Sequence, residues 1–149
     1  PRSTPLYSSA ASDVYKRQDT FSNLPFYSQS VAAGFPSPAD DFLEFDLSLD
    51  KKLIKHPSAT FFVRVSGTSM INAKIFDGSI LLVDRAEKIK NNDIVLAVVD
   101  GDFTVKRYRK VGVSVFLYPE NKAMRPIKIL EGSESYVWGK VMWSFNSVA

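Results

Sequence analysis

The chain has 149 residues, of which 45% are hydrophobic and 23% charged, enough for one domain with a single core. It has no cysteine and one histidine, which excludes disulfides, thiol catalysis and cysteine-ligated zinc and leaves no basis for expecting a cofactor. No apolar run is long enough to span a bilayer and no signal peptide is visible, so the sequence favours a cytoplasmic protein with no membrane partner.

The first segment, residues 1–18, is not expected to belong to the folded domain. Residues 8–18 look like the translation of a common sequencing-library adapter, and residues 1–4 fit the primer beside it. We therefore expect the natural N-terminus to be missing. The segment contributes +2 of the formal net charge of +3, from Arg2, Lys16 and Arg17 against Asp13. Because the rest of the chain is then nearly neutral, its overall charge does not favour direct nucleic-acid binding.

The next segment, residues 19–38, is expected to be an extended arm. Its last part, Gly34-Phe35-Pro36-Ser37-Pro38, lacks two backbone donors and cannot continue a helix. Extended peptides are what protease clefts bind, commonly as an added strand. The bond between Ala33 and Gly34 is sterically uncrowded, although an Ala-Gly pair beside prolines is by itself typical of a linker.

Residues 39–149 are predicted to form one mainly β domain. Aromatic and β-branched residues dominate its apolar runs, and Asp100-Gly101 between two of them favours a type I′ hairpin. Helical signals are short and fall within residues 39–52 and 70–75. The predicted strands are 60–66, 80–83, 94–99, 103–108, 113–118 and 136–143.

Two residues suggest chemistry when they are taken together. Ser69 lies in a turn after a predicted strand, and Lys106 ends the run Phe103-Thr104-Val105-Lys106. A serine hydroxyl needs a base to become a nucleophile, and a lysine serves if burial keeps it neutral. Backbone N–H groups of Ser69 and Met70 would then stabilise an oxyanion. Alternation puts Lys106 on the same side of its strand as Thr104 and Tyr108 but does not say which side faces the core.

The order of these motifs resembles the LexA-type self-cleaving serine–lysine peptidases, most closely the UmuD branch. Four runs carry the resemblance in matching order from Leu24 onward: Gly34-Phe35-Pro36-Ser37-Pro38-Ala39, His56-Pro57-Ser58-Ala59-Thr60, Ser66-Gly67-Thr68-Ser69-Met70 and Val99-Asp100-Gly101-Asp102-Phe103-Thr104-Val105-Lys106. The resemblance implies a single LexA/UmuD-like domain of twisted antiparallel sheets and hairpins. It also implies Ser69 as nucleophile, Lys106 as general base, and Ala33–Gly34 as the bond that is cut.

The same resemblance implies partners that the residues alone do not. A protein of this branch forms a homodimer, cuts itself when a RecA filament on single-stranded DNA acts as co-protease, and then serves as accessory subunit of a UmuC-like translesion DNA polymerase in the SOS response. The main alternative is the peptidase domain of a LexA-type repressor whose DNA-binding domain is missing. A structural subunit with an inactive site is a further alternative, which the intact Ser69 and Lys106 disfavour.

Several residues also have simpler interpretations. Ser69 alone is typical of a turn or helix cap, and residues 106–110 alone are typical of a solvated strand end, with nucleic-acid binding through Tyr108 as a stacking ring a minor alternative. His56 reads as a polar loop residue rather than a metal ligand, and the acidic residues between 40 and 46 read as a solvated surface. Five aromatic residues are assigned to the core or a dimer interface: Phe61, Phe62, Phe116, Trp138 and Trp143.

Overall fold

The computed structural model describes residues 23–27, 33–34 and 43–149, which fall into two compact units divided between Lys55 and His56. In the first unit, β1 (Asn23–Tyr27) pairs antiparallel with β2 (Leu43–Ser48), and the short α2 (Leu49–Leu53) follows. The helix predicted within residues 39–52 is thus correct only near its end, because residues 43–48 pair as a strand. Most of the predicted arm lies outside the described residues, and its boundary at residue 38 stays a prediction.

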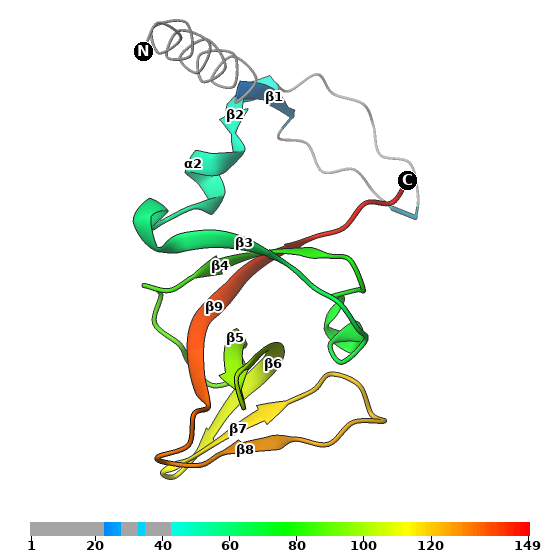
Figure 1. Ribbon diagram of the computed structural model, residues 1–149. Helices are drawn as coiled ribbons and strands as arrows, with labels where there is room; N and C mark the ends of the chain where they lie inside the picture. Colours follow the sequence, from blue (N-terminus) through cyan, green and yellow to red (C-terminus); the bar gives the residue numbers. More distant parts are fainter. Residues whose placement is uncertain (1–22, 28–32, 35–42) are drawn as a thin grey trace, which may run out of the picture. The chain divides into compact units, whose positions relative to one another are not determined.

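The second unit is built around one antiparallel sheet of seven strands, in the order β3-β4-β9-β5-β6-β7-β8 (Figure 1). The mainly β fold class is therefore confirmed. The two edge strands are β3 (Thr60–Arg64) and β8 (Ile127–Ile129). The other elements are η1 (Pro57–Ala59), η2 (Ile71–Ala73), β4 (Ile80–Asp84), β5 (Ile94–Val99), β6 (Asp102–Val111), β7 (Ser114–Tyr118) and β9 (Tyr136–Phe145).

The hairpin between β5 and β6 has the turn that its sequence predicts. Asp100 and Gly101 both have positive φ, 50° and 85°, as a type I′ turn requires. All six residues of β5 pair in register from Ile94↔Arg107 to Val99↔Asp102. In the second unit, sequence reading missed β8, because three residues after Pro126 are too few to show alternation.

Alternation on β5 divides the apolar residues between two clusters on opposite faces of the sheet. Leu96 belongs to the larger cluster with Met70, Ile75, Leu81 and Val83, whereas its neighbours Val95 and Ala97 belong to a second cluster with Leu117. Of the aromatic residues assigned to the core, Phe61 and Trp138 pack on the first cluster. Phe62 and Trp143 are instead 61% and 46% exposed.

The exposure of Phe62 and Trp143 has a simple geometric cause. Both pair with Leu82, so they lie on the face opposite Phe61 and the core residue Leu81. A role of that face in a dimer stays a prediction. No helix among the described residues is long and apolar enough to cross a membrane.

Gly139 is the tightest point of the sheet, where β9 passes between β4 and β5. A Cβ atom there would lie 2.7 Å from Val83 Cγ1 and 3.3 Å from the Asp84 carbonyl oxygen. Val83 is fully buried and branched at Cβ, so it has little freedom to move aside. We predict that Gly139→Ala lowers the free energy of unfolding by about 1–3 kcal/mol.

Denaturant unfolding followed by circular dichroism measures this loss. Ser144→Ala, on the same strand, is the matched control, because Ser144 Oγ is buried without a hydrogen-bond partner in the described part of the chain. Its removal should leave stability unchanged or raise it by about 1 kcal/mol. Equal destabilisation by both variants would contradict the close approach at Gly139.

Candidate active site

Ser69 lies in the turn that connects β3 to η2, and the next residue anchors this turn in the core. Met70 is 2% exposed and belongs to the main apolar cluster. Gly67 adopts φ of 96°, which favours glycine, and its N–H donates to Asp77 Oδ1 at 2.9 Å. The turn is therefore held from both sides of Ser69, by packing at Met70 and by a hydrogen bond at Gly67.

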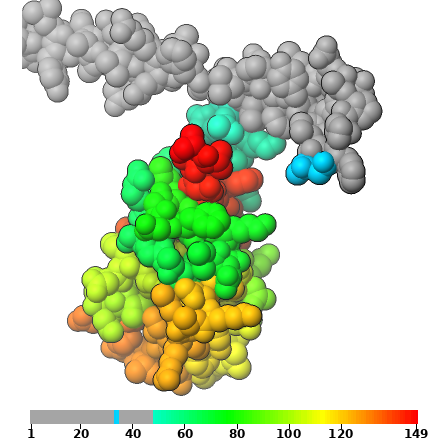
Figure 2. All heavy atoms as spheres, turned by 90° about the vertical axis from the view of Figure 1, so that its right-hand side faces the viewer, coloured from blue at the N-terminus to red at the C-terminus, as the bar shows by residue number. Residues whose placement is uncertain are grey.

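The loop that follows β7 fixes the same turn from a distant part of the chain. The Asn121 side-chain amide donates to the carbonyl of Thr68 at 3.0 Å, and Asn72 N–H donates to the carbonyl of Glu120 at 2.9 Å. In Figure 2 this loop, in amber, lies against the green segment that contains the turn. The Glu120 side chain is itself paired with Arg107 on β6. These contacts connect the serine turn to the strand that carries the lysine.

Lys106 brings its amine to Ser69. It lies in β6, just before the pairing of β6 with β7 begins at Arg107. Lys106 Nζ is 2.9 Å from Ser69 Oγ, 2.7 Å from Thr104 Oγ1 and 3.1 Å from the Val105 carbonyl oxygen. The two residues singled out in the sequence, 37 positions apart, are therefore within hydrogen-bonding distance.

The Lys106 side chain is buried on an apolar face of the sheet. Lys106 is 8% exposed and pairs with the fully buried Val95, so its side chain shares a face with Val95 and Ala97. Among the described residues, no carboxylate lies within ion-pairing distance of it. Burial disfavours the charged form and lowers the pKa of Lys106 from its ordinary value of 10.5.

The three partners of the amine also set the direction of its lone pair. When Lys106 is neutral, it retains two N–H donors, and the Val105 carbonyl can only accept. Thr104 Oγ1 is the second acceptor on the same strand. With these two N–H groups engaged, the lone pair faces Ser69 Oγ, which can donate its proton. This is the arrangement that a serine nucleophile and its general base require.

A small pocket opens beside Ser69. Its volume is about 110 Å³, and it is lined by residues 63–66 of β3 and its continuation, Ser69, Leu96, and residues 103–105 of β6. Since β3 is an edge strand, the pocket lies along a sheet edge that pairs with no further strand in the described part of the chain. Such an edge can accept an extended peptide as an additional strand.

The remaining predicted site residues are placed as follows. The N–H groups of Ser69 and Met70 donate no hydrogen bond to another described residue, and their part in an oxyanion site stays a prediction. Ala33 and Gly34 form an exposed bend in the first unit. Tyr108, considered above as a stacking ring, instead packs inward on the cluster of Val95.

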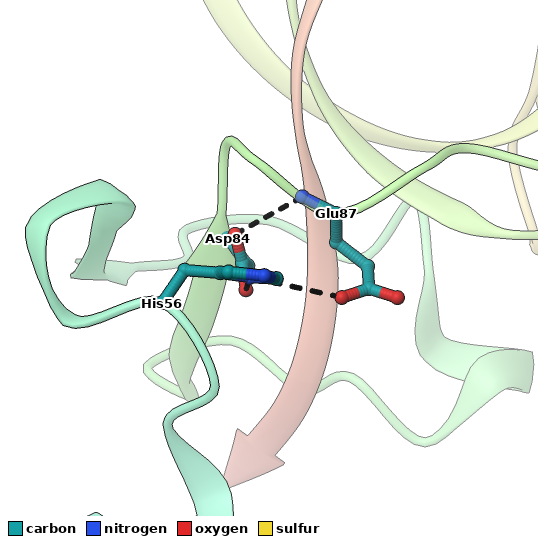
Figure 3. Close-up of side chains that lie close together, drawn as sticks. All are labelled: His56, Asp84 and Glu87. Carbon is teal, nitrogen blue, oxygen red and sulfur yellow. Dashed lines mark hydrogen bonds and ion pairs between the residues drawn. The ribbon is translucent and has the colours of Figure 1, made fainter.

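His56 also has a more specific environment than the sequence suggested. Its Nδ1 is 2.7 Å from Asp84 Oδ2 and 3.8 Å from Glu87 Oε2, and Figure 3 shows the three side chains converging. The three residues could supply ligands to a metal ion. However, both oxygens of the buried Asp84 already accept hydrogen bonds, from His56 and from the N–H groups of Ala86 and Glu87.

The balance of forces on Asp84 agrees with a structural role. Burial acts to raise the pKa of its carboxyl, but the hydrogen bonds from His56 and from the backbone outweigh burial and lower it. The carboxylate is therefore stable as an anion inside the fold. It joins the start of the second unit, at His56, to the end of β4.

Comparison with known proteins agrees with this geometry. Residues 25–142 match the family described as Peptidase S24-like. The chain belongs to this family. It is 42% identical over 123 residues to Protein MucA of Salmonella typhimurium, a match that covers 82% of this chain and 84% of MucA. It is 52% identical over 83 residues to Protein ImpA of the same species, covering 56% of this chain and 57% of ImpA.

A repressor is also among the relatives of this S24 peptidase. The chain is 41% identical over 113 residues to LexA repressor 2 of Geobacter sulfurreducens, which covers 75% of this chain and 55% of that protein. The resemblance to the UmuD branch of LexA-type peptidases is therefore confirmed at the level of the family.

Sequence reading did not identify the residues that position the dyad. Asp77 precedes a glycine and looks like an ordinary turn residue, and Asn121 lies 53 residues from the carbonyl that it contacts. Thr104 was visible only as a same-side neighbour of Lys106. Alternation is a local signal, so it indicated Thr104, whereas contacts made across the fold leave no local pattern.

The lowered pKa of Lys106 predicts how stability depends on pH. The folded protein binds fewer protons than the unfolded chain between the folded pKa and 10.5, so burying this lysine costs stability at neutral pH. That cost decreases as pH rises through this window. We predict that Lys106→Met is more stable than the wild type at pH 7 and that the difference shrinks as pH approaches 10.5.

Urea unfolding at pH 7, 8, 9 and 10 measures this difference. Lys110→Met is the matched control, since Lys110 is an exposed lysine on the same strand. Its difference from the wild type should stay constant across the series. A pH-independent gain in Lys106→Met would contradict a lowered pKa.

Proposed function

We propose that this S24 peptidase is a serine endopeptidase that cuts its own chain between Ala33 and Gly34. The observation that carries the proposal is the 2.9 Å approach of Lys106 Nζ to Ser69 Oγ in a setting that favours the neutral amine. Family membership supports a peptidase. The choice of bond rests on the resemblance and on the extended, proline-flanked sequence around it.

In the proposed reaction, neutral Lys106 takes the proton of Ser69 Oγ, which attacks the carbonyl carbon of Ala33. The N–H groups of Ser69 and Met70 donate to the oxyanion of the tetrahedral intermediate. As the C–N bond breaks, Lys106 returns the proton to the amine of Gly34. Water then attacks the acyl-enzyme while Lys106 accepts its proton. Lys106 returns this proton to Ser69 Oγ as the acyl C–O bond breaks, which leaves a free carboxyl group on Ala33.

The pocket beside the edge strand β3 supports the mode of binding. An extended arm could add a strand next to residues 63–66 and place the small side chain of Ala33 near Ser69. Because enzyme and substrate share one chain, tethering raises the effective concentration of the bond, and a modest intrinsic activity is sufficient.

The biological role that we propose follows the UmuD branch. The protein would form a homodimer in the cytoplasm and cut itself when a RecA filament on single-stranded DNA promotes docking of the arm. The product beginning at Gly34 would then serve a UmuC-like translesion polymerase as an accessory subunit. The relatives at 42–52% identity support this branch, and the LexA relative supports the alternative of a repressor's peptidase domain. Sequencing the gene upstream of residue 19 distinguishes an accessory subunit of a polymerase from the peptidase domain of a repressor.

We predict slow self-cleavage at Ala33–Gly34 whose rate rises with pH until Lys106 is neutral. Ser69→Ala and Lys106→Ala should each lower the rate about a thousandfold or more, because nucleophile and base act as a unit. Mass spectrometry of incubated protein identifies the cut. Ser58→Ala and Lys110→Ala serve as matched controls and should cleave at the wild-type rate. Equal cleavage in all variants, or a flat pH response, would contradict the dyad.

We also predict that Asn121 acts as a positioning residue. Asn121→Ala removes the hydrogen bond to the Thr68 carbonyl and loosens the serine turn, so cleavage should slow about 10- to 100-fold. The pH at which the rate is half-maximal should stay unchanged, since Lys106 keeps its surroundings. Asn146→Ala, an exposed asparagine near the C-terminus, is the control. A shifted pH profile would show that Asn121 acts on the lysine instead.

A further inference from the structure

The basic residues of the second unit are concentrated in one part of the sheet. Residues 102–130, which include β6, β7 and β8, contain seven lysines and arginines against Asp102 and Glu120, a formal net charge of +5 that becomes +4 when Lys106 is neutral. Residues 56–101 contain five basic and five acidic residues and are neutral. A net charge taken over the whole chain hides this local concentration.

The strand register places part of this charge on one face of the sheet. Arg109 pairs with Phe116, and Phe116 pairs with Lys128, so the three side chains form a row across β6, β7 and β8. Tyr118 lies two residues from Phe116 on the same face, with 6.2 Å between the ring centroids. We call these four residues the basic face. The opposite face of these strands packs inward through Leu117, Ile127 and Ile129.

Arg109 and Lys128 each contact an aromatic ring of the basic face, and neither forms an ion pair within the described residues. The Arg109 guanidinium lies 5.1 Å from the centre of the Tyr118 ring, and Lys128 Nζ lies 5.9 Å from the centre of the Phe116 ring. Both residues are exposed, and neither is within ion-pairing distance of a carboxylate among the described residues. Arg107 differs, because it is paired with Glu120.

We propose that the basic face binds single-stranded nucleic acid. Arg109 and Lys128 have no ion-pair partner among the described residues and lie beside two partly exposed rings. Single strands bind surfaces of this kind with phosphates on the cations and bases on the rings. An acidic polypeptide would need the cations but would gain little from the two rings beside them. The ring that sequence reading considered, Tyr108, faces inward, whereas Phe116 and Tyr118 lie on the outer face.

Fluorescence anisotropy with a labelled 20-nucleotide oligo-dT tests the proposal. The full chain is used with Ser69→Ala in every sample, so that the protein stays intact. If two phosphates are contacted, one by each cation of the basic face, raising the salt concentration from 50 to 200 mM should weaken binding roughly sevenfold. Failure to observe saturable binding at 50 mM salt would overturn the proposal.

Paired charge reversals locate the surface. Arg109→Glu with Lys128→Glu should weaken binding at least about tenfold, since two phosphate contacts are lost. Lys88→Glu with Lys90→Glu is the matched control, because both lysines are exposed, lie between β4 and β5, and give the same change in net charge. Equal losses in the two pairs would overturn the proposal. All samples carry Arg2, Lys16 and Arg17, so any binding by these residues cancels.

Substitution of the two rings distinguishes binding of nucleic acid from binding of an acidic polypeptide. Phe116→Leu with Tyr118→Leu should weaken oligo-dT binding about fivefold or more through lost stacking. Unlabelled poly-glutamate of equal charge should compete poorly. If poly-glutamate displaces oligo-dT as well as unlabelled oligo-dT does, the face recognises charge alone, and an acidic polypeptide takes the place of nucleic acid. Thermal unfolding checks that each variant is folded. If the ring variant is unfolded, the Arg109→Glu and Lys128→Glu pair alone tests the proposal.

Discussion

The candidate active site depends on one constraint, the burial of a lysine amine without an opposite charge. Val95 and Ala97 surround Lys106 on its face of the sheet, and no described carboxylate stabilises its ammonium form. Burial therefore lowers its pKa, and the contacts with Thr104 and Val105 direct its lone pair to Ser69. A carboxylate in this position would favour the ammonium form, which cannot accept a proton.

The rest of the second unit maintains this arrangement. The regular pairing of β5 and β6 places Lys106 opposite a buried residue, and Met70 fixes the serine turn in the core. The loop after β7 closes the connection through Asn121 and Glu120. The same hairpin that carries the lysine continues into the basic face, so the proposed catalytic and nucleic-acid sites lie on one strand, β6, on opposite sides of its backbone.

Local patterns predicted much of this structure. Alternation and turn residues identified most of the strands of the second unit and the type I′ hairpin at Asp100-Gly101, because these depend on neighbouring residues. They failed for β8, which is too short, and for β2, which forms only by pairing with β1. They could not choose between the core and an interface for Phe62, which its register with Leu82 places on the exposed face.

By itself, the sequence determined the mainly β class and the candidate residues Ser69 and Lys106. It also determined that residues 1–18 supply most of the net charge of the chain. Only the tertiary structure decided that these residues meet at 2.9 Å, that Tyr108 faces inward, and that Arg109 and Lys128 share a face with two rings. The physical reason is the range of the interactions. Turn geometry and alternation act within a few residues, whereas desolvation, pairing register and the Asn121 contact arise only when distant segments pack together.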